Sequence, residues 1–228
     1  MEAIVLAGGF GTRLKRVVPD LPKPMAPIAG RPFLEILLST LARKGFSRAI
    51  LSLGFMADKI IDHFGESYQG MELTYEVEKL PLGTGGAIRA ALTHCIDDHA
   101  FVFNGDTYLD LEVSQLENLW LRNRRPIVVV REVLDATRFG RVEVSDGWIT
   151  SFLEKGLSGA GLINAGCYVL PRFALDAFAL GVNFSFEAEY LSKNLMHTSL
   201  LGFETHGHFI DIGIPEDFRR AQIELTGL

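Results

Sequence analysis

The chain has 228 residues, of which 48% are hydrophobic and 22% charged, and its formal net charge is −6 with histidine neutral. This length is enough to bury a sizeable core, and α/β proteins of this size often form one domain. An acidic chain lacks the basic face that nucleic acid or an anionic membrane requires, which excludes both as general partners. A local basic pocket for a phosphorylated small molecule remains compatible with this charge.

Short apolar runs alternate with helical patterns through the first part of the chain. The runs predicted as strands are Glu2–Ala7, Arg48–Gly54, Glu72–Val77, Ala100–Asp106 and Pro126–Val133. The segments with apolar residues three and four positions apart, predicted as helices, are Phe33–Lys44, Ala57–Phe64, Thr84–His94 and Ser114–Arg122. This alternation is typical of a doubly wound, mostly parallel Rossmann-like sheet with right-handed crossovers and helices on both faces.

The second half of the chain is less regular. Arg141–Lys155 predicts a small antiparallel hairpin that turns at Asp146 and Gly147, so the sheet is expected to be mixed. The further predictions are a strand at Leu162–Leu170, helices beginning near Pro171 and Phe186, strands at Thr198–Thr205 and His208–Asp211, and a last helix with Pro215 in its first turn. No repeat or linker divides the chain, so we expect a single α/β domain over residues 1–228.

The cysteines and the N-terminus predict the compartment. Cys95 and Cys167 are far apart, without C-x-x-C spacing, and we interpret them as reduced, buried thiols. Acidic Glu2 stands where a secretory signal carries basic residues. No apolar run approaches the roughly 18 residues of a membrane span. These features predict a cytoplasmic protein.

Two motifs at predicted strand ends mark a candidate ligand site. The loop "LAGGFGTRL" (Leu6–Leu14) does not fit G-x-G-x-x-G, because Leu14 replaces the third glycine, and the chain has no G-x-x-x-x-G-K-[ST] motif. Downstream, Lys23 lies between two prolines, which stiffen the segment that presents it. "NGD" (Asn104–Asp106) also follows a strand. Ligands bind beyond the carboxyl ends of strands in such sheets, so both motifs indicate one place.

Together these motifs resemble the signature of the sugar-1-phosphate nucleotidyltransferases, the pyrophosphorylases that make nucleotide sugars. After "LAGGFGTRL" and "PKPM", the likeness continues in register through "PLGTGGAI" (Pro81–Ile88), "FNGD" (Phe103–Asp106), "FGRV" (Phe139–Val142), "FLEK" (Phe152–Lys155), "NAGCYV" (Asn164–Val169) and "FIDIGIPEDF" (Phe209–Phe218). Ordered motifs over nearly the whole chain are specific where any single one is weak. The resemblance implies transfer of a nucleoside monophosphate from a triphosphate to a sugar 1-phosphate, with release of pyrophosphate.

The resemblance also implies roles for residues on the nucleotide side. Arg13 would hold the leaving pyrophosphate with its planar fork, and Lys23 would lie against the α-phosphate. Asp106 and Asp211 would hold Mg²⁺, and Arg13, Lys23 and Asp106 are the implied catalytic residues. The residues implied to bind the nucleotide are Leu6, Ala7, Gly8, Gly9, Gly11, Thr12, Arg13, Lys23, Gly83, Thr84, Gly105 and Asp106.

On the acceptor side, the resemblance places Lys155 on the phosphate of the sugar 1-phosphate. It places Glu154, Asn164 and the Gly140 amide on sugar hydroxyls. Residues 1–110 would then be mainly the nucleotide-binding half of the domain, and residues 135–215 mainly the sugar-phosphate-binding half.

Two further segments carry expectations of their own. "PLGTGGA" is expected to open a helix that Thr84 caps, with glycines that let a flat base lie against the backbone. The Phe-rich segment Phe173–Tyr190 is interpreted as core and lid packing.

Within the family, "PLGTGGA" on a short chain looks most like guanylyltransferases that act on D-glycero-α-D-manno-heptose 1-phosphate. The alternatives are a mannose-1-phosphate guanylyltransferase and a uridylyltransferase for N-acetylmuramate or hexose 1-phosphate. A non-catalytic nucleotide-sugar-sensing subunit ranks lower, since the charged motif residues are all present: Arg13, Lys23, Asp106, Lys155 and Asp211. A glycosyltransferase ranks lower because no D-x-D pair follows Asn104. The expected partners are therefore GTP and a sugar 1-phosphate, without nucleic acid or membrane, and a homo-oligomer is left open.

Overall fold

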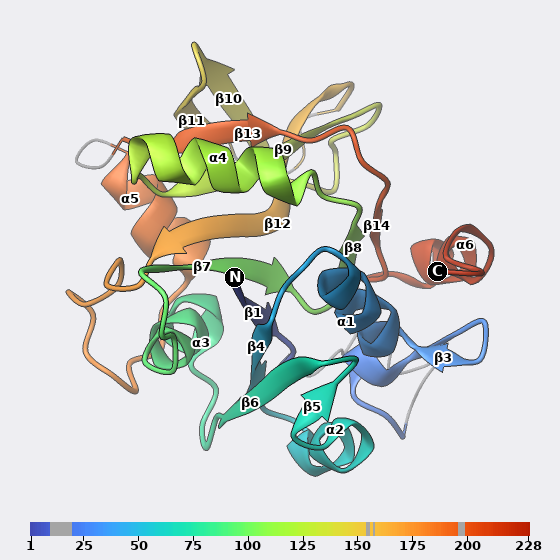
Figure 1. Ribbon diagram of the computed structural model, residues 1–228. Coiled ribbons are helices and arrows are strands. Elements are labelled where there is room, and N and C mark those ends of the chain that lie inside the picture. The colour runs from blue at the N-terminus through green and yellow to red at the C-terminus, as the bar shows by residue number, and fades with distance from the viewer. Residues whose placement is uncertain (10–19, 154–155, 157, 196–198) are drawn as a thin grey trace.

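The computed structural model describes residues 1–9, 20–153, 156, 158–195 and 199–228, and Figure 1 shows their arrangement. The strands of the main sheet are β1 (Glu2–Leu6), β4 (Arg48–Leu53), β5 (Ser67–Tyr68), β6 (Met71–Val77), β7 (His99–Asn104), β9 (Ile127–Val133), β10 (Arg141–Ser145), β11 (Trp148–Leu153), β12 (Gly161–Pro171) and β13 (Leu201–Glu204). Across the described residues, they lie in the order β10-β11-β13-β9-β12-β7-β1-β4-β6-β5. Two small antiparallel pairs join β2 (Pro27–Ile28) to β3 (Arg31–Pro32) and β8 (Thr107–Leu109) to β14 (Phe209–Asp211).

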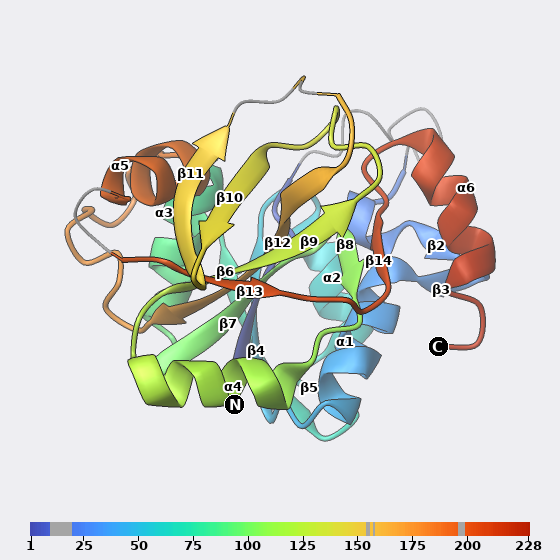
Figure 2. The same ribbon diagram turned by 90° about the horizontal axis from the view of Figure 1, so that it is seen from above.

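The described helices cover both faces of this sheet (Figures 1 and 2). They are η1, a 3-10 helix (Lys23–Met25), α1 (Phe33–Arg43), α2 (Ala57–Phe64), α3 (Gly83–Leu92), α4 (Val113–Asn123), η2, a π-helix (Phe186–Leu191), α5 (Ser192–Asn194) and α6 (Pro215–Glu224). The strands and helices predicted before residue 134 are all present, with bounds within two residues of those expected. In the part of the chain that is described, no helix is both long and apolar enough to cross a membrane.

The middle of the sheet is parallel. β1 pairs with β4 on one side and β7 on the other, and β4 pairs with β6, all in parallel. β12 then runs antiparallel between β7 and β9, and β10 and β11 form the predicted hairpin. The α/β fold with a mixed sheet is therefore confirmed, and its parallel part is the centre, since antiparallel pairs flank it. Because β1, β4, β6 and β7 point the same way, their carboxyl ends meet at one edge.

The core divides into layers on the two faces of the sheet. In β1, Ala3 and Val5 face a cluster that includes α1, α2 and α4, whereas Ile4 faces a cluster that includes α3 and η2. All three side chains are fully buried. This explains why the strand is an unbroken apolar run, as expected for a strand covered on both faces. A third cluster packs α6 against β2 and the start of α1.

The helix predicted to begin near Pro171 is wrong. Residues 172–177 form successive turns, with hydrogen bonds from the amide of residue i+3 to the carbonyl of residue i. The carbonyl of Phe178 instead accepts a hydrogen bond from Arg89 Nε at 3.2 Å, and its ring stacks on Phe184 with centroids 4.0 Å apart. These contacts hold the segment as turns against α3. The second predicted helix does begin at Phe186, as η2.

The expected cap of α3 is also wrong, because the helix begins at Gly83 and Thr84 lies inside its first turn. The Thr84 hydroxyl instead accepts a hydrogen bond from the Phe186 amide at 3.0 Å. Two backbone hydrogen bonds strengthen the same junction, Gly85 N to Phe184 O at 2.9 Å and Phe184 N to Leu82 O at 3.0 Å. The threonine therefore joins two segments that are a hundred residues apart in the chain.

The glycines of "PLGTGG" make this junction possible. A Cβ on Gly85 would lie 2.2 Å from the Phe184 ring, and one on Gly86 would lie 2.4 Å from the Val182 carbonyl oxygen. Gly83 has a φ of +67° and would meet the Phe184 carbonyl oxygen at 2.6 Å. On the side of each glycine where a Cβ would project, the close neighbour is therefore the protein's own chain.

A Gly85→Ala variant should be less stable than the wild type by about 1–3 kcal/mol, because overpacking displaces the buried Phe184 ring. Gly9→Ala is the matched control, since no atom of the described residues lies within 4 Å of a Cβ placed there. Urea unfolding measures both variants. Equal midpoints for the two would contradict the packing role of Gly85.

Candidate active site

A cavity of about 340 Å³ lies beyond the carboxyl ends of the central parallel strands. Its lining includes every described member of the predicted nucleotide set: Leu6, Ala7, Gly8, Gly9, Lys23, Gly83, Thr84, Gly105 and Asp106. Gly11, Thr12 and Arg13 lie outside the described residues. Segments from β1, η1, α3 and the loop after β7 thus converge on one cavity, as expected for strand ends that share an edge.

Glycine is required at the floor of this cavity for two different reasons. A Cβ on Gly105 would meet the Leu6 carbonyl oxygen at 2.6 Å, so this glycine lets the loop after β7 pack on β1. A Cβ on Gly8 would lie 3.1 Å from the Glu78 carboxylate. Among the described residues, no atom lies within 4 Å of a Cβ placed on Gly9, so the backbone here could accept a ligand without displacing them.

Glu78, which we did not predict, adds a second carboxylate to this cavity beside Asp106. It directly follows β6 and accepts a hydrogen bond from the Leu82 amide at 2.9 Å. Burial raises the pKa of this carboxyl, and the hydrogen bond from Leu82 opposes that effect. The lining residues Ser52 and Asn104, also not predicted, come from the ends of β4 and β7. A search for polar residues at the ends of all four parallel strands would have found them.

Lys23 and Asp106 form an ion pair at the edge of the cavity. Only 11% of the lysine side chain is exposed, since it starts a 3-10 helix whose next two residues, Pro24 and Met25, are buried. Asp106 also accepts a hydrogen bond from the Thr107 hydroxyl at 3.3 Å. The proline-flanked lysine is therefore held in place against a carboxylate at a strand end.

Asp211 lies near this pair. β14 pairs Asp211 with Thr107 of β8, and the Ile212 amide donates to the Asp106 carbonyl at 3.0 Å. Burial, followed by the negative charge of Asp106, raises the pKa of the Asp211 carboxyl, whereas Lys23 lowers it. The short β8–β14 pair thus joins residues that are a hundred positions apart in the sequence and brings two like charges together.

Two adjacent carboxylates fit a hard divalent cation, which would relieve their repulsion. Among the described residues, no group of three or more His, Cys, Asp or Glu side chains could enclose a metal by itself. Mg²⁺ is typically bound by one or two carboxylates, with phosphate oxygens and water completing its coordination. Asp106 and Asp211 match that kind of site.

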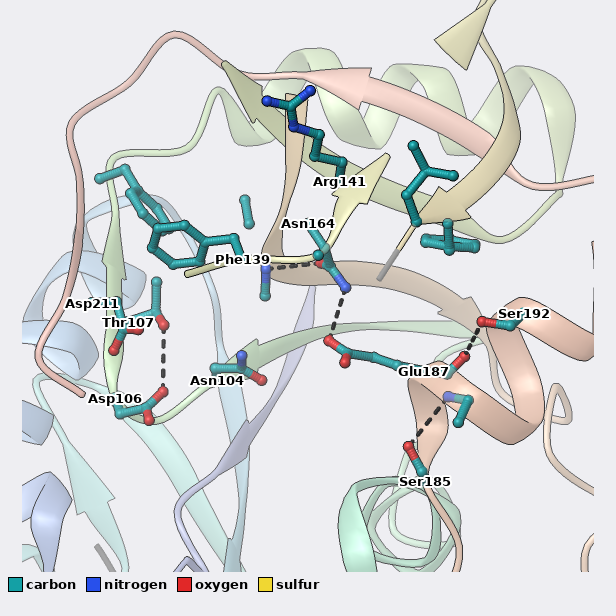
Figure 3. Close-up of a pocket in the computed structure, with 17 residues that line it drawn as sticks. Asn104, Asp106, Thr107, Phe139, Arg141, Asn164, Ser185, Glu187, Ser192 and Asp211 are labelled. Atoms are coloured by element: carbon teal, nitrogen blue, oxygen red, sulfur yellow. Dashed lines mark hydrogen bonds between the residues drawn. The ribbon is translucent and has the colours of Figure 1, made fainter. Parts of the chain in front are cut away.

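A second cavity, of about 640 Å³, adjoins the first (Figure 3). Gly140, Asn164, Asp106 and Asp211 of the predicted set line it. Glu154 and Lys155 lie outside the described residues. Asn104 and Asp106 line both cavities, so the two spaces meet at the ion pair of Asp106 with Lys23.

The second cavity also contains polar residues that we did not predict. Figure 3 shows Glu187, Ser185 and Ser192 on the side opposite Asp106 and Asp211. They belong to the end of the Phe-rich segment and to α5. Phe184, Phe186 and Tyr190 of that segment are buried as expected, but Phe173 is exposed. The alternation of buried aromatic and polar residues over 184–187 was a usable signal for an element that faces a cavity.

The loop that carries Gly140 is tied to α6. Arg138, in the same loop, pairs with the Asp217 carboxylate at 2.7 Å, and Arg220 pairs with its other oxygen at 2.9 Å. Asp217 is buried. Phe139 lines the cavity and packs edge-on against Phe209 of β14. The last helix therefore supports the wall of the second cavity.

Known proteins match both the sequence and this architecture. The family model for nucleotidyl transferases matches residues 2–226. A D-glycero-alpha-D-manno-heptose 1-phosphate guanylyltransferase of Aneurinibacillus thermoaerophilus is 37% identical over 226 residues, covering 99% of this chain and 98% of that protein. The protein of that name from Campylobacter jejuni is 39% identical over 219 residues, covering 96% and 97%.

A solved structure matches as well. The crystal structure of HddC from Yersinia pseudotuberculosis, complexed with GMP-PN, has a TM-score of 0.86 and 38% sequence identity, and covers 97% of both chains. The family match spans nearly the whole chain, and these relatives are aligned over nearly their whole length. The chain therefore belongs to the nucleotidyl transferase family.

Proposed function

We propose that this protein transfers GMP from GTP to D-glycero-α-D-manno-heptose 1-phosphate, forming GDP-heptose and pyrophosphate. The observation that carries the proposal is the position of Asp106, paired with Lys23 where two cavities meet. A reaction between two phosphorylated substrates needs such a junction. The sugar and the base follow from the relatives, whose names specify heptose 1-phosphate guanylyltransferases.

The reaction joins a phosphate oxygen of the sugar to the α-phosphorus of GTP while the bond from that phosphorus to the β-phosphate bridging oxygen breaks. Its main demands are in-line positioning and neutralisation of charge on the phosphates. Lys23 would lie against the α-phosphate, and Arg13 would hold the pyrophosphate. On the acceptor side, Lys155 would hold the sugar phosphate, while Glu154 and the Gly140 amide would meet hydroxyls.

Mg²⁺ is the cation that we assign to Asp106 and Asp211. When bound, it would neutralise charge on the phosphates. The closeness of the two carboxylates supports this assignment.

We also propose that the two substrates are bound mainly by different halves of the chain. Residues 1–110 supply the lining of the smaller cavity, and most of the larger cavity is lined by residues 135–215. This distribution supports a nucleotide-binding half followed by a sugar-phosphate-binding half within one domain.

The choice of GTP is supported by Glu78 in the smaller cavity. A carboxylate only accepts hydrogen bonds. The Watson–Crick edge of guanine offers two adjacent donors, N1–H and N2–H, which a carboxylate can accept together. Uracil and thymine offer one donor between two carbonyls, and adenine and cytosine place a ring acceptor beside their amino group. A carboxylate therefore favours guanine among the four bases.

The test of the proposed function is pyrophosphate release from GTP, UTP, dTTP, ATP and CTP, each with heptose, mannose, glucose or N-acetylmuramate 1-phosphate. Heptose 1-phosphate with GTP should give the highest kcat/KM. A preference for mannose 1-phosphate would identify the alternative guanylyltransferase. A preference for UTP or dTTP would contradict the assignment of the base, and no release with any pair would contradict catalysis.

A Glu78→Gln variant should have a KM for GTP that is raised about tenfold or more, because a hydrogen bond to a charged acceptor is worth about 1.5–3 kcal/mol. Its preference for GTP over UTP should fall, since glutamine can donate to a carbonyl as well as accept. Glu76→Gln is the matched control, two positions earlier and outside the cavity lining. An unchanged preference in Glu78→Gln would remove Glu78 from base selection.

A further inference from the structure

The side chain of Asn164, which the motif assigns to the sugar, is already bonded within the protein. Its Oδ1 accepts a hydrogen bond from the Gly166 amide at 3.0 Å. The two hydrogens on Nδ2 are donated to the Tyr168 hydroxyl, at 2.8 Å, and to Glu187 Oε1, at 3.1 Å. An Asn side chain has two donors and two acceptor positions, so a sugar would find at most one acceptor position here.

The surroundings keep Asn164 in this arrangement. Tyr168 is buried at 3% exposure, so its hydroxyl depends on the protein for a partner. Gly166 has a φ of +72° in the irregular part of β12, where the register with β9 shifts between Asn164 and Tyr168. The Oδ1 bond to the Gly166 amide closes this irregular turn of the strand. Releasing Asn164 for a ligand would leave buried partners unsatisfied.

Glu187, in contrast, faces the larger cavity and is exposed. Its Oε1 is held by Asn164, as Figure 3 shows. Its backbone is held as well, because the Ser192 hydroxyl donates to the Glu187 carbonyl at 2.9 Å and the preceding Phe186 amide donates to Thr84. The structure thus presents an oriented carboxylate to the cavity.

We propose that Glu187 is a specificity-determining contact for the sugar, and that Asn164 is a positioning residue that orients it. The carboxylate would accept hydrogen bonds from hydroxyls remote from the anomeric phosphate. This inference rests on the proposed function, since it assigns to the Glu187 carboxylate the recognition of sugar hydroxyls in that reaction.

The choice of remote hydroxyls follows from the layout of the cavity. The anomeric phosphate must reach the α-phosphate of the nucleotide, at the junction marked by Asp106 and Lys23. Glu187 lies across the cavity from Asp106 and Asp211 in Figure 3. A sugar whose phosphate is at the junction would therefore extend its other end towards Glu187. A hydroxyl-rich end is a set of donors, which suits a group that only accepts.

The first experiment compares KM values in pyrophosphate release. Glu187→Gln should raise the KM for the sugar 1-phosphate about tenfold to a hundredfold, the range for losing a hydrogen bond to a charged group, and leave the KM for GTP within about twofold. Glu189→Gln is the matched control, because Glu189 lies two positions along the same helix and its carboxylate accepts from the Ser185 amide, a role that glutamine keeps. An unchanged sugar KM in Glu187→Gln would overturn the proposal.

The second experiment separates positioning from direct contact. If Asn164 acts through Glu187, Asn164→Ala added to Glu187→Ala should cause no further rise in the sugar KM. If Asn164 contacts the sugar itself, the two effects should multiply, and that result would overturn its positioning role. An unchanged KM for GTP shows that each variant is folded.

The third experiment identifies the hydroxyl. The ratio of kcat/KM between wild type and Glu187→Gln should stay the same with a 2-deoxy sugar 1-phosphate and fall with a 4-deoxy or a 6-deoxy sugar. A fall with the 2-deoxy sugar alone would overturn the placement of Glu187 at the remote end. An inactive wild type would overturn the proposed function, whereas an active wild type that is insensitive to Glu187 substitution would overturn this inference alone.

Discussion

Replacing Asp106 by Asn is expected to lower kcat by about a thousandfold or more while leaving the fold intact. Asp106 lines both cavities, pairs with Lys23 and lies close to Asp211. The substitution removes one of the two charges proposed to hold Mg²⁺. A thousandfold corresponds to about 4 kcal/mol of transition-state stabilisation, which is the scale expected for a metal that acts on charged phosphates.

The measurement is single-turnover formation of the GDP-sugar at saturating substrates, together with thermal unfolding. Asparagine can still accept from Lys23, so the midpoint of unfolding should move little. Asp110→Asn is the matched control, because Asp110 lies four positions along the same segment and pairs with Lys44 at 2.6 Å outside both cavities. Activity near that of the wild type in Asp106→Asn would refute the proposed role.

Replacing Lys23 by Met is the second large effect, with an expected loss in kcat of about a hundredfold to a thousandfold. The side chain keeps its length and loses its charge, and removal of one preorganised group that stabilises transition-state charge typically costs this much. The KM for GTP should change less than kcat, because the charge on the α-phosphate grows in the transition state. Lys44→Met is the control, since Lys44 is another carboxylate-paired lysine outside the cavities.

A Mg²⁺ titration gives this variant a second readout. In the structure, the Lys23 ammonium occupies one oxygen of Asp106. Without the lysine, less Mg²⁺ should be needed for half-maximal activity, because the ammonium no longer competes with the cation for that carboxylate. A higher Mg²⁺ requirement would show that Lys23 does not compete with the cation there.

The junction of "PLGTGG" with residues 182–186 connects the walls of the two cavities. Thr84 lines the smaller cavity and accepts from the Phe186 amide, and Glu187, the next residue, lines the larger cavity. The two walls are therefore one hydrogen-bonded unit. Phe184, which belongs to a distant segment, occupies the space where the side chains of Gly83 and Gly85 in "PLGTGG" would otherwise project.

The sequence alone determined the elements before residue 134 and most of the residues that line the smaller cavity. Parallel strands end at a common edge, so a glycine loop after β1 and "NGD" after β7 have to be neighbours, whatever the details of packing. Period and spacing are local properties of the chain, and they were sufficient for Lys23, Gly9 and Asp106. Motif order then identified the family.

Only the tertiary structure decided the remainder, because it depends on contacts between distant segments. β14 had to pair with β8 before Asp211 could face Asp106. The position of Thr84 in the sequence is typical of a helix cap, but its hydroxyl accepts a hydrogen bond from the amide of Phe186, in a distant part of the sequence. Asn164 has a motif position typical of a sugar ligand, but both of its donors are used within the protein, one of them by the Glu187 carboxylate that faces the larger cavity. Each polar side chain can make only a few hydrogen bonds, and only the folded structure shows which partners take them.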